Sequence, residues 1–180
     1  LQQRFSHATD LCAEAVRRTR VTAARRGWTD GFTVAARIRE YALATVQGRS
    51  PIECEALRGS ATSAIANLAH APKAVRSILE QRLAAVAAGT VNPDVAANEA
   101  ALRLLCIRAE LISGAPTPPE DLELRREYQM RRLVESMGHG ERVTPAALDD
   151  LALEWIAIGP VEPAVHDALL ARFERCRTAR

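Results

Sequence analysis

A cluster of arginines near the start of the sequence has the chemistry of an anion-binding surface. Its members are Arg17, Arg18, Arg20, Arg25 and Arg26, with Glu14 as the nearby acid. Guanidinium groups bind phosphates and carboxylates, so this segment is a candidate for salt-dependent, sequence-independent contact with nucleic acid. The alternatives are a solvated helix and a helix that docks on an acidic protein surface. Only Trp28 and Phe32 lie nearby for base stacking, and no known nucleic-acid-binding motif is present.

Two further arginines interrupt apolar helix faces. On a helical wheel Arg108 lies in the middle of a leucine and isoleucine face, and Arg126 lies within the apolar stripe of the following helix. A buried guanidinium needs an anion or carbonyl groups to offset its desolvation. We predict a buried ion-pair network, with an anion site and arginines that reach solvent as alternatives. The candidate residues are Arg108, Arg126, Arg132, Glu110 and Glu123, with Glu127, Asp150 and Glu154 as further partners for the network.

Catalytic and metal-binding patterns are missing from the sequence. Its histidines are His7, His70, His139 and His166, and none has a Ser, Cys or carboxylate at a spacing that fixes a catalytic pair. The four cysteines, Cys12, Cys54, Cys106 and Cys176, lack the spacing of a zinc or redox motif. We therefore expect no enzyme activity, no cofactor and no metal, and free thiols in a reducing cytoplasm.

Helix-start signals recur along the chain. Each is a small polar residue followed by proline, which suits the first helical position. These signals are Ser50-Pro51, Asn92-Pro93, Thr117-Pro118 and Thr144-Pro145; the first and third have a glutamate that completes a capping box, and Ala71-Pro72 is weaker. Gly48, Gly89, Gly114 and Gly138 mark helix ends. Helices are predicted at residues 2–26, 29–47, 51–69, 72–88, 93–113, 118–137, 145–157 and 163–178.

The predicted fold is all-α, with about seven or eight antiparallel helices in a bundle like that of helical-repeat proteins. Three parts are expected: a basic helical hairpin at residues 1–47, a central bundle at 48–138 and a C-terminal hairpin at 139–180. The hairpin at the C-terminus contains the segment Trp-x-x-Ile-Gly-Pro. The predicted structural anchors are Trp28, Trp155, Gly159 and Pro160.

The two ends of the chain share the pattern Leu-x-x-Arg-Phe-x-x-small. It occurs at Leu1, Arg4, Phe5 and Ala8 and again at Leu169, Arg172, Phe173 and Cys176. The segment 153–161, LEWIAIGPV, precedes the second copy. Together they resemble the bacterial domain-of-unknown-function family 349, whose tandem helical repeats carry Trp-x-x-Ile-Gly-Pro-Val before a helix with Leu-x-x-Arg-Phe. Segments 105–111 and 126–129 resemble stretches between the repeats of longer members.

This resemblance implies a cytoplasmic protein with several helical repeats, in which residues 1–47 contain the end of a preceding repeat. It brings no activity, because the function of the family is not established.

The net charge is only +2, but residues 1–50 hold nine arginines and four acids, while residues 116–180 hold nine arginines and twelve acids.

We expect a non-catalytic scaffold or interaction module, without a membrane partner, that binds a protein or a neighbouring repeat. Binding of RNA or DNA through the arginine-rich N-terminal helix is the alternative.

Overall fold

The computed structural model describes the backbone of residues 2–136 and 146–178 and the side chains of residues 13–19, 21–134 and 148–178. All regular structure in these ranges is helical, which confirms the predicted all-α class. The elements are α1 (Gln2–Val46), α2 (Pro51–Ala66), α3 (Lys73–Ala87), α4 (Val95–Ser113), the 3₁₀-helix η1 (Pro119–Asp121), α5 (Leu122–Ser136), α6 (Ala146–Ala157) and α7 (Pro163–Thr178).

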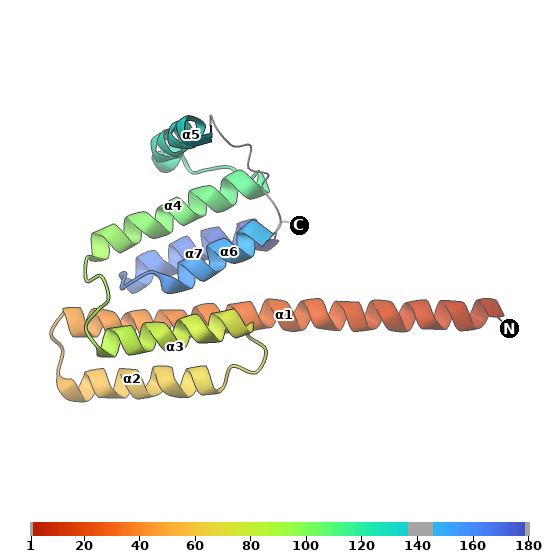
Figure 1. The fold of residues 1–180 in the computed structure, drawn as a ribbon, viewed down its shortest axis with the longest axis horizontal. Helices are drawn as coiled ribbons and strands as arrows, with labels where there is room; N and C mark the ends of the chain where they lie inside the picture. The colour runs from red at the N-terminus through yellow and green to blue at the C-terminus, as the bar shows by residue number, and fades with distance from the viewer. Residues whose placement is uncertain (1, 137–145, 179–180) are drawn as a thin grey trace.

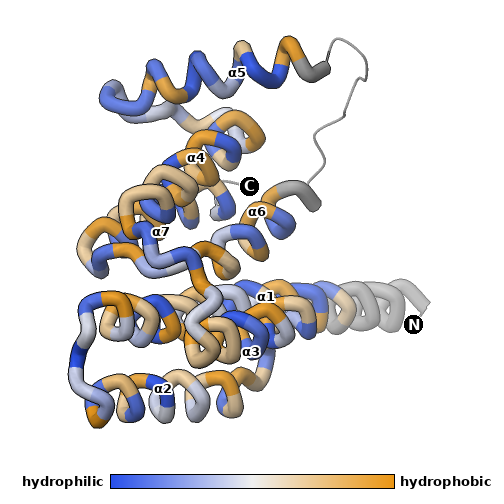
Figure 2. The backbone as a smooth tube through the Cα atoms, turned by 60° about the vertical axis from the view of Figure 1, so that its left-hand side comes forward, coloured by the Kyte–Doolittle hydropathy of each residue, from blue (hydrophilic) through white to orange (hydrophobic). Residues whose placement is uncertain are grey.

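The helices form two groups of three, and α5 lies outside both (Figure 1). Helices α1, α2 and α3 pack together in one group, and α6 and α7 pack with α4 in the other. The groups meet where α6 and α7 contact α1 and where α6 contacts α3. Sequential helices were expected to be antiparallel neighbours, but α5 runs across α4 (Figure 2).

Helix α1 is continuous from Gln2 to Val46, so the predicted break between residues 26 and 29 and the predicted hairpin within residues 1–47 are wrong. The glycines in this region serve close packing. A Cβ atom on Gly27 would overlap the backbone carbonyl of His70, and a Cβ atom on Gly31 would lie 2.7 Å from Cγ1 of Val75. The missing side chains therefore allow α1 to run directly against the α2–α3 connection and α3.

The helix ends agree with the sequence in part. The capping box of Ser50 and Glu53 is present, and Gly48, Gly89 and Gly114 adopt positive φ beyond the ends of α1, α3 and α4. Gly138 and Thr144-Pro145 lie outside the described residues.

Two predicted caps differ from the structure. Asn92 was predicted to cap a helix that begins at residue 93, but α4 begins at Val95. Its cap is Asp94, whose side chain accepts a hydrogen bond from the Ala97 amide (3.0 Å). The capping box at Thr117 and Glu120 is wrong, because the Thr117 hydroxyl instead donates to Glu110 Oε2 (2.5 Å) and η1 precedes α5.

The core is centred on aromatic rings from three helices. Trp155 of α6 is fully buried and stacks on Phe173 of α7 with a centroid distance of 4.8 Å, and Phe32 of α1 meets the edge of Phe173 at 6.2 Å. Trp155 is therefore an anchor of the fold. Trp28 is half-buried, and the guanidinium of Arg177 lies 4.6 Å from the centre of its ring.

The turn after α6 is tightly packed. Gly159 and Pro160 are buried, the Asn98 side chain donates to the carbonyl of Pro160 (3.1 Å), and a Cβ atom on Gly159 would meet this amide group. One hydrophobic core contains side chains from all three predicted segments of the chain, and the division at residues 47/48 and 138/139 stays a prediction.

Candidate functional site

The first half of α1 extends away from the helical bundle (Figure 1). We call residues 2–26 the arm. Each arm side chain that the structure describes is exposed or half-buried, and burial of α1 begins at Gly27. Over residues 13–26 the described side chains of the arm therefore lie largely in solvent.

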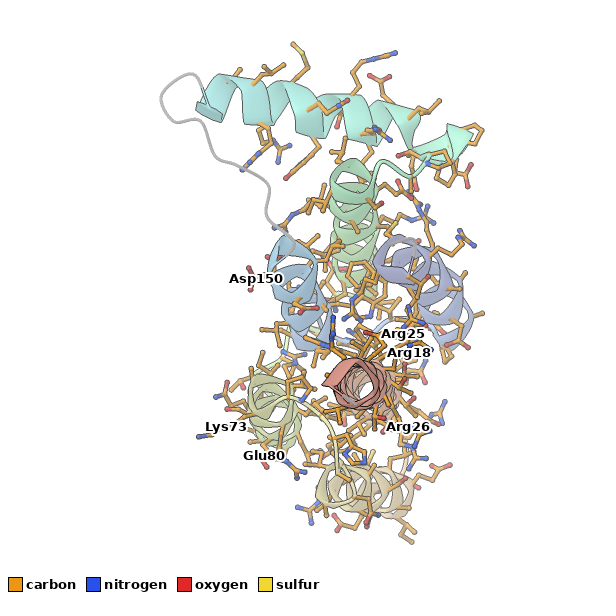
Figure 3. All side chains as sticks on the ribbon, turned by 90° about the vertical axis from the view of Figure 1, so that its right-hand side faces the viewer. Arg18, Arg25, Arg26, Lys73, Glu80 and Asp150 are labelled. Atoms are coloured by element: carbon orange, nitrogen blue, oxygen red, sulfur yellow. The ribbon has the colours of Figure 1, made fainter. Side chains whose placement is uncertain are left out.

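One side of the arm is basic. At about 100° per residue, Arg17, Arg18, Arg25 and Arg26 fall within one half of the helix circumference. Viewed along α1, Arg18, Arg25 and Arg26 lie on one side, whereas Glu80 and Asp150 lie on the other (Figure 3). The side chain of Arg20 lies outside the described residues. The structure therefore brings four of the five predicted arginines to one surface, which we call the basic face.

Few acids neutralise the basic face. Glu14 pairs with Arg18 Nε at 3.0 Å and with Arg17 Nη2 at 3.5 Å, while the two arginine side chains remain 79% and 73% exposed. Within the described part of the chain, Arg25 and Arg26 have no ion pair. Their charges remain available to an anionic ligand.

A groove lies beside the basic face where the arm meets the bundle. It has a volume of about 460 Å³ and is lined by Arg18, Thr19, Thr22, Ala23 and Arg26 of α1 and by His70 of the α2–α3 connection. The hydroxyl groups of Thr19 and Thr22 donate to the backbone carbonyls of Ala15 and Arg18, so their protons are already bound. The donors for a ligand are the two guanidiniums and the imidazole.

A buried ion-pair network exists, but its central cation is Arg172 of α7. Arg172 Nε donates to Glu110 Oε1 (2.5 Å), and its Nη1 donates to Asp121. All three side chains are less than a tenth exposed. Burial would lower the pKa of Arg172, but the hydrogen bonds to Glu110 and Asp121 outweigh it and raise the pKa. The network ties α7 to α4 and to η1.

Glu110 is the candidate that belongs to this network, while Arg108 pairs outside it with Glu154, one of its predicted partners. Arg108 makes a bidentate pair with Glu154, and its side chain is 30% exposed. Arg126 pairs with Glu123 on the surface of α5, and both side chains are about 70% exposed. Arg132 is exposed as well. The prediction that Arg108 and Arg126 point together into the core is wrong, because the apolar stripe of α5 faces outward.

A second buried arginine was not predicted. Arg39 of α1 donates through Nε to the carbonyl of Ile158 (3.3 Å) and through Nη2 to that of Trp155, so it caps the C-terminal end of α6. Burial, and then repulsion by Arg82, lowers the pKa of Arg39 to about 9. Arg39 shares one face of the helix with Phe32, Ala35 and Ala42. This spacing in the sequence indicates that the Arg39 side chain is buried.

The shifted pKa values of the buried histidine and cysteine side chains favour their neutral forms. His166 is buried, and burial and the nearby Arg39 lower its pKa. Burial raises the pKa of the Cys106 thiol to about 12, which makes it a poor nucleophile at neutral pH. Cys54, Cys106 and Cys176 are free thiols; the side chains of His7 and Cys12 and all of His139 lie outside the described residues.

The described residues contain no cluster of three or more metal-ligating side chains. None of the helices in the described ranges combines the length and apolarity needed to cross a membrane.

No protein-family model, curated protein or solved structure matches the chain. The resemblance to family 349 therefore stays a prediction.

Proposed function

We propose that the protein is a non-catalytic helical module that binds nucleic acid through the basic face of its arm. The observation that carries this proposal is the exposure of Arg17, Arg18, Arg25 and Arg26 on a helix that projects from the bundle. Phosphates of RNA or DNA are the natural ligands of such a surface, because release of their counterions favours binding. The bundle serves as the scaffold that presents the arm.

The composition of residues 13–26 of the arm favours nucleic acid over a protein partner. Among its described side chains the largest apolar ones are Val16 and Val21, which are 51% and 65% exposed. Protein interfaces are usually stabilised by a few large buried anchors such as Trp, Tyr or Leu at the centre of the contact. This part of the arm offers charge and small side chains, which suit a phosphate backbone better than an apolar groove.

Fluorescence anisotropy with a labelled single-stranded RNA and a labelled DNA duplex at 50 and 200 mM salt tests the proposal. About four phosphate contacts predict binding that is roughly 50-fold to 150-fold weaker at the higher salt. Binding should disappear in a quadruple variant: Arg17→Ala, Arg18→Ala, Arg25→Ala, Arg26→Ala.

A control variant removes the same charge from exposed arginines outside the arm: Arg37→Ala, Arg49→Ala, Arg131→Ala, Arg175→Ala. It should retain most of the affinity if the arm is the binding surface. Equal losses in the two variants would show that binding depends on net charge alone. Absence of binding at 50 mM salt would overturn the proposal.

A protein-binding scaffold is the second candidate function, and α5 is the observation that favours it. Leu122, Met130, Leu133 and Val134 of this helix are each more than half exposed. Large exposed apolar side chains on one helix are common at protein-interaction sites. A Met130→Lys variant should lose a protein partner captured by the wild-type chain, while binding of nucleic acid remains unchanged.

The cellular setting is part of the same proposal. We place the protein in the bacterial cytoplasm, as a member of family 349 in which the arm is the end of a preceding helical repeat. The support is the pattern shared by residues 1–8 and 169–176 together with the Trp-x-x-Ile-Gly-Pro-Val segment. A neighbouring repeat would then lie beyond the arm, on the side away from the bundle.

A further inference from the structure

We infer that the groove formed by Arg18, Arg26 and His70 is a binding site for one phosphate group of the nucleic-acid backbone. This inference rests on the proposed function and assigns a fixed contact point to it. The remainder of the basic face would then supply less specific attraction, while the groove sets where the strand passes between the arm and the bundle.

The groove depends on the close approach of two backbones. Gly27 lies directly after Arg26, and its lack of a side chain allows the carbonyl of His70 to lie against α1. The α2–α3 connection is thereby held beside the last turn of the arm, and His70 lines the same groove as Arg18 and Arg26. The three cationic or hydrogen-bonding side chains thus come from two elements that are fixed relative to one another.

The side chains that line the groove can donate hydrogen bonds to an oxyanion. Arginine binds phosphate through two parallel N–H groups, and an imidazole N–H can donate to a third oxygen. Glu14 pairs with Arg18 through Nε, which leaves the terminal nitrogens of this guanidinium for a second acceptor. The lining residues include no carboxylate, so no negative charge within the groove opposes an anion.

The size of the groove fits a phosphate that belongs to a larger molecule. Its volume of about 460 Å³ falls within the usual range of ligand sites, roughly 300 to 1,000 Å³. A single phosphate ion would fill only part of this space, and the adjoining sugar of a nucleotide would occupy the rest. We therefore assign the site to a phosphodiester of a strand.

The experiment compares two double variants of the full chain that lose the same charge from the same helix. One removes the groove arginines, Arg18→Gln and Arg26→Gln, and the other removes their neighbours, Arg17→Gln and Arg25→Gln. Anisotropy with a labelled single-stranded oligonucleotide should show at least a tenfold greater loss of affinity for the groove variant. Equal losses would overturn the inference, and circular dichroism checks that both variants are folded.

The imidazole of His70 reports on the groove directly. Its ¹³Cε1–¹H signal in NMR spectra, assigned by its absence from His70→Ala, should shift when an unlabelled oligonucleotide is added. A parallel titration with inorganic phosphate distinguishes the source of the ligand: a shift with the oligonucleotide, with or without one from phosphate, supports the inference. A shift with phosphate alone overturns the assignment to a strand.

The test separates this inference from the proposed function. If the oligonucleotide binds through the arm but leaves the His70 signal unchanged, the groove assignment fails and the proposed function stands. If no oligonucleotide binds at low salt, both fail.

Discussion

The buried cluster of Glu110, Asp121 and Arg172 concentrates charge in the interior, so the loss of its cation should be costly. Replacing Arg172 by Met leaves two nearly buried carboxylates without their main partner. We expect the free energy of unfolding to fall by about 3 to 5 kcal/mol. Urea denaturation followed by circular dichroism measures this change.

The pair formed by Arg108 and Glu154 provides the matched comparison. Both side chains are about a third to a half exposed, so Arg108→Met should cost only about 0 to 1 kcal/mol. Adding Glu110→Gln to the Arg172→Met variant should restore part of the stability, because it removes one unpaired charge. Similar losses for Arg108→Met and Arg172→Met would contradict this ranking of the two ion pairs.

Buried His166 should make the stability depend on pH. Burial, followed by repulsion from Arg39, lowers its pKa from the ordinary value of 6.5, so below that pH the unfolded chain takes up a proton more readily than the folded chain. The free energy of unfolding should therefore fall as the pH drops below about 6.5. Urea denaturation at pH 7.5 and 5.5 should show a smaller difference for His166→Gln than for the wild type. The same difference in both proteins would argue against this role of His166.

Individual side chains were harder to predict than their helices. The apolar stripe around Arg126 on α5 indicated burial, but its residues Leu122, Met130 and Leu133 are more than half exposed. Glu110 was identified as a member of a buried network, yet its partner Arg172 lies 62 residues away in the sequence. Periodicity shows which residues share a face of a helix, and only the tertiary structure shows what that face meets.

At the level of the elements, two glycines in helices should respond to alanine in opposite ways. A Cβ atom on Gly27 of α1 would overlap the His70 carbonyl, whereas a Cβ atom on Gly59 of α2 would meet no atom within 4 Å. We expect Gly27→Ala to destabilise the fold by about 1 to 3 kcal/mol through overpacking. Gly59→Ala should stabilise it by about 0.5 to 1 kcal/mol, because alanine is the better helix former.

Thermal or urea denaturation of the two variants measures both effects. If Gly27→Ala were as stable as Gly59→Ala, α1 would not be packed against the α2–α3 connection in solution. The position of His70 in the groove would then lose its structural basis.

The elements themselves were largely predictable. Capping chemistry is local, so the start of α2 and the helix-terminating glycines Gly48, Gly89 and Gly114 could be read from neighbouring residues. The break predicted between residues 26 and 29 is wrong because α1 continues through Gly27, where the glycine permits close packing. Only the tertiary structure shows the segment that packs there.

For the molecule as a whole, α1 belongs to two environments. Its second half packs against both helix groups, while the arm leaves the bundle. The sequence identified the arginines of the arm, but not that they lie on a continuous helix beyond the core. This required the position of the bundle, because the described side chains of α1 become fully buried only from Gly27 onward.

The two halves of α1 should therefore differ in stability although they form one helix. A helical segment with few tertiary contacts is only marginally stable in water, so amides of the arm before the groove should exchange hydrogen with opening free energies of about 0 to 1 kcal/mol. Amides around Ile38 and Ala42, which lie in the core, should approach the global unfolding value. Hydrogen exchange followed by mass spectrometry resolves the two regions in the same experiment.

Bound nucleic acid should slow hydrogen exchange of the arm amides and leave the exchange rates of the core amides unchanged. Protection of residues 13–26 on addition of an oligonucleotide, lost again at high salt, is expected if the basic face holds the phosphates. An arm that is already as protected as the core without a ligand would contradict the picture of an unsupported helix. Repeating the measurement at several protein concentrations would then show whether a second copy of the chain covers the arm.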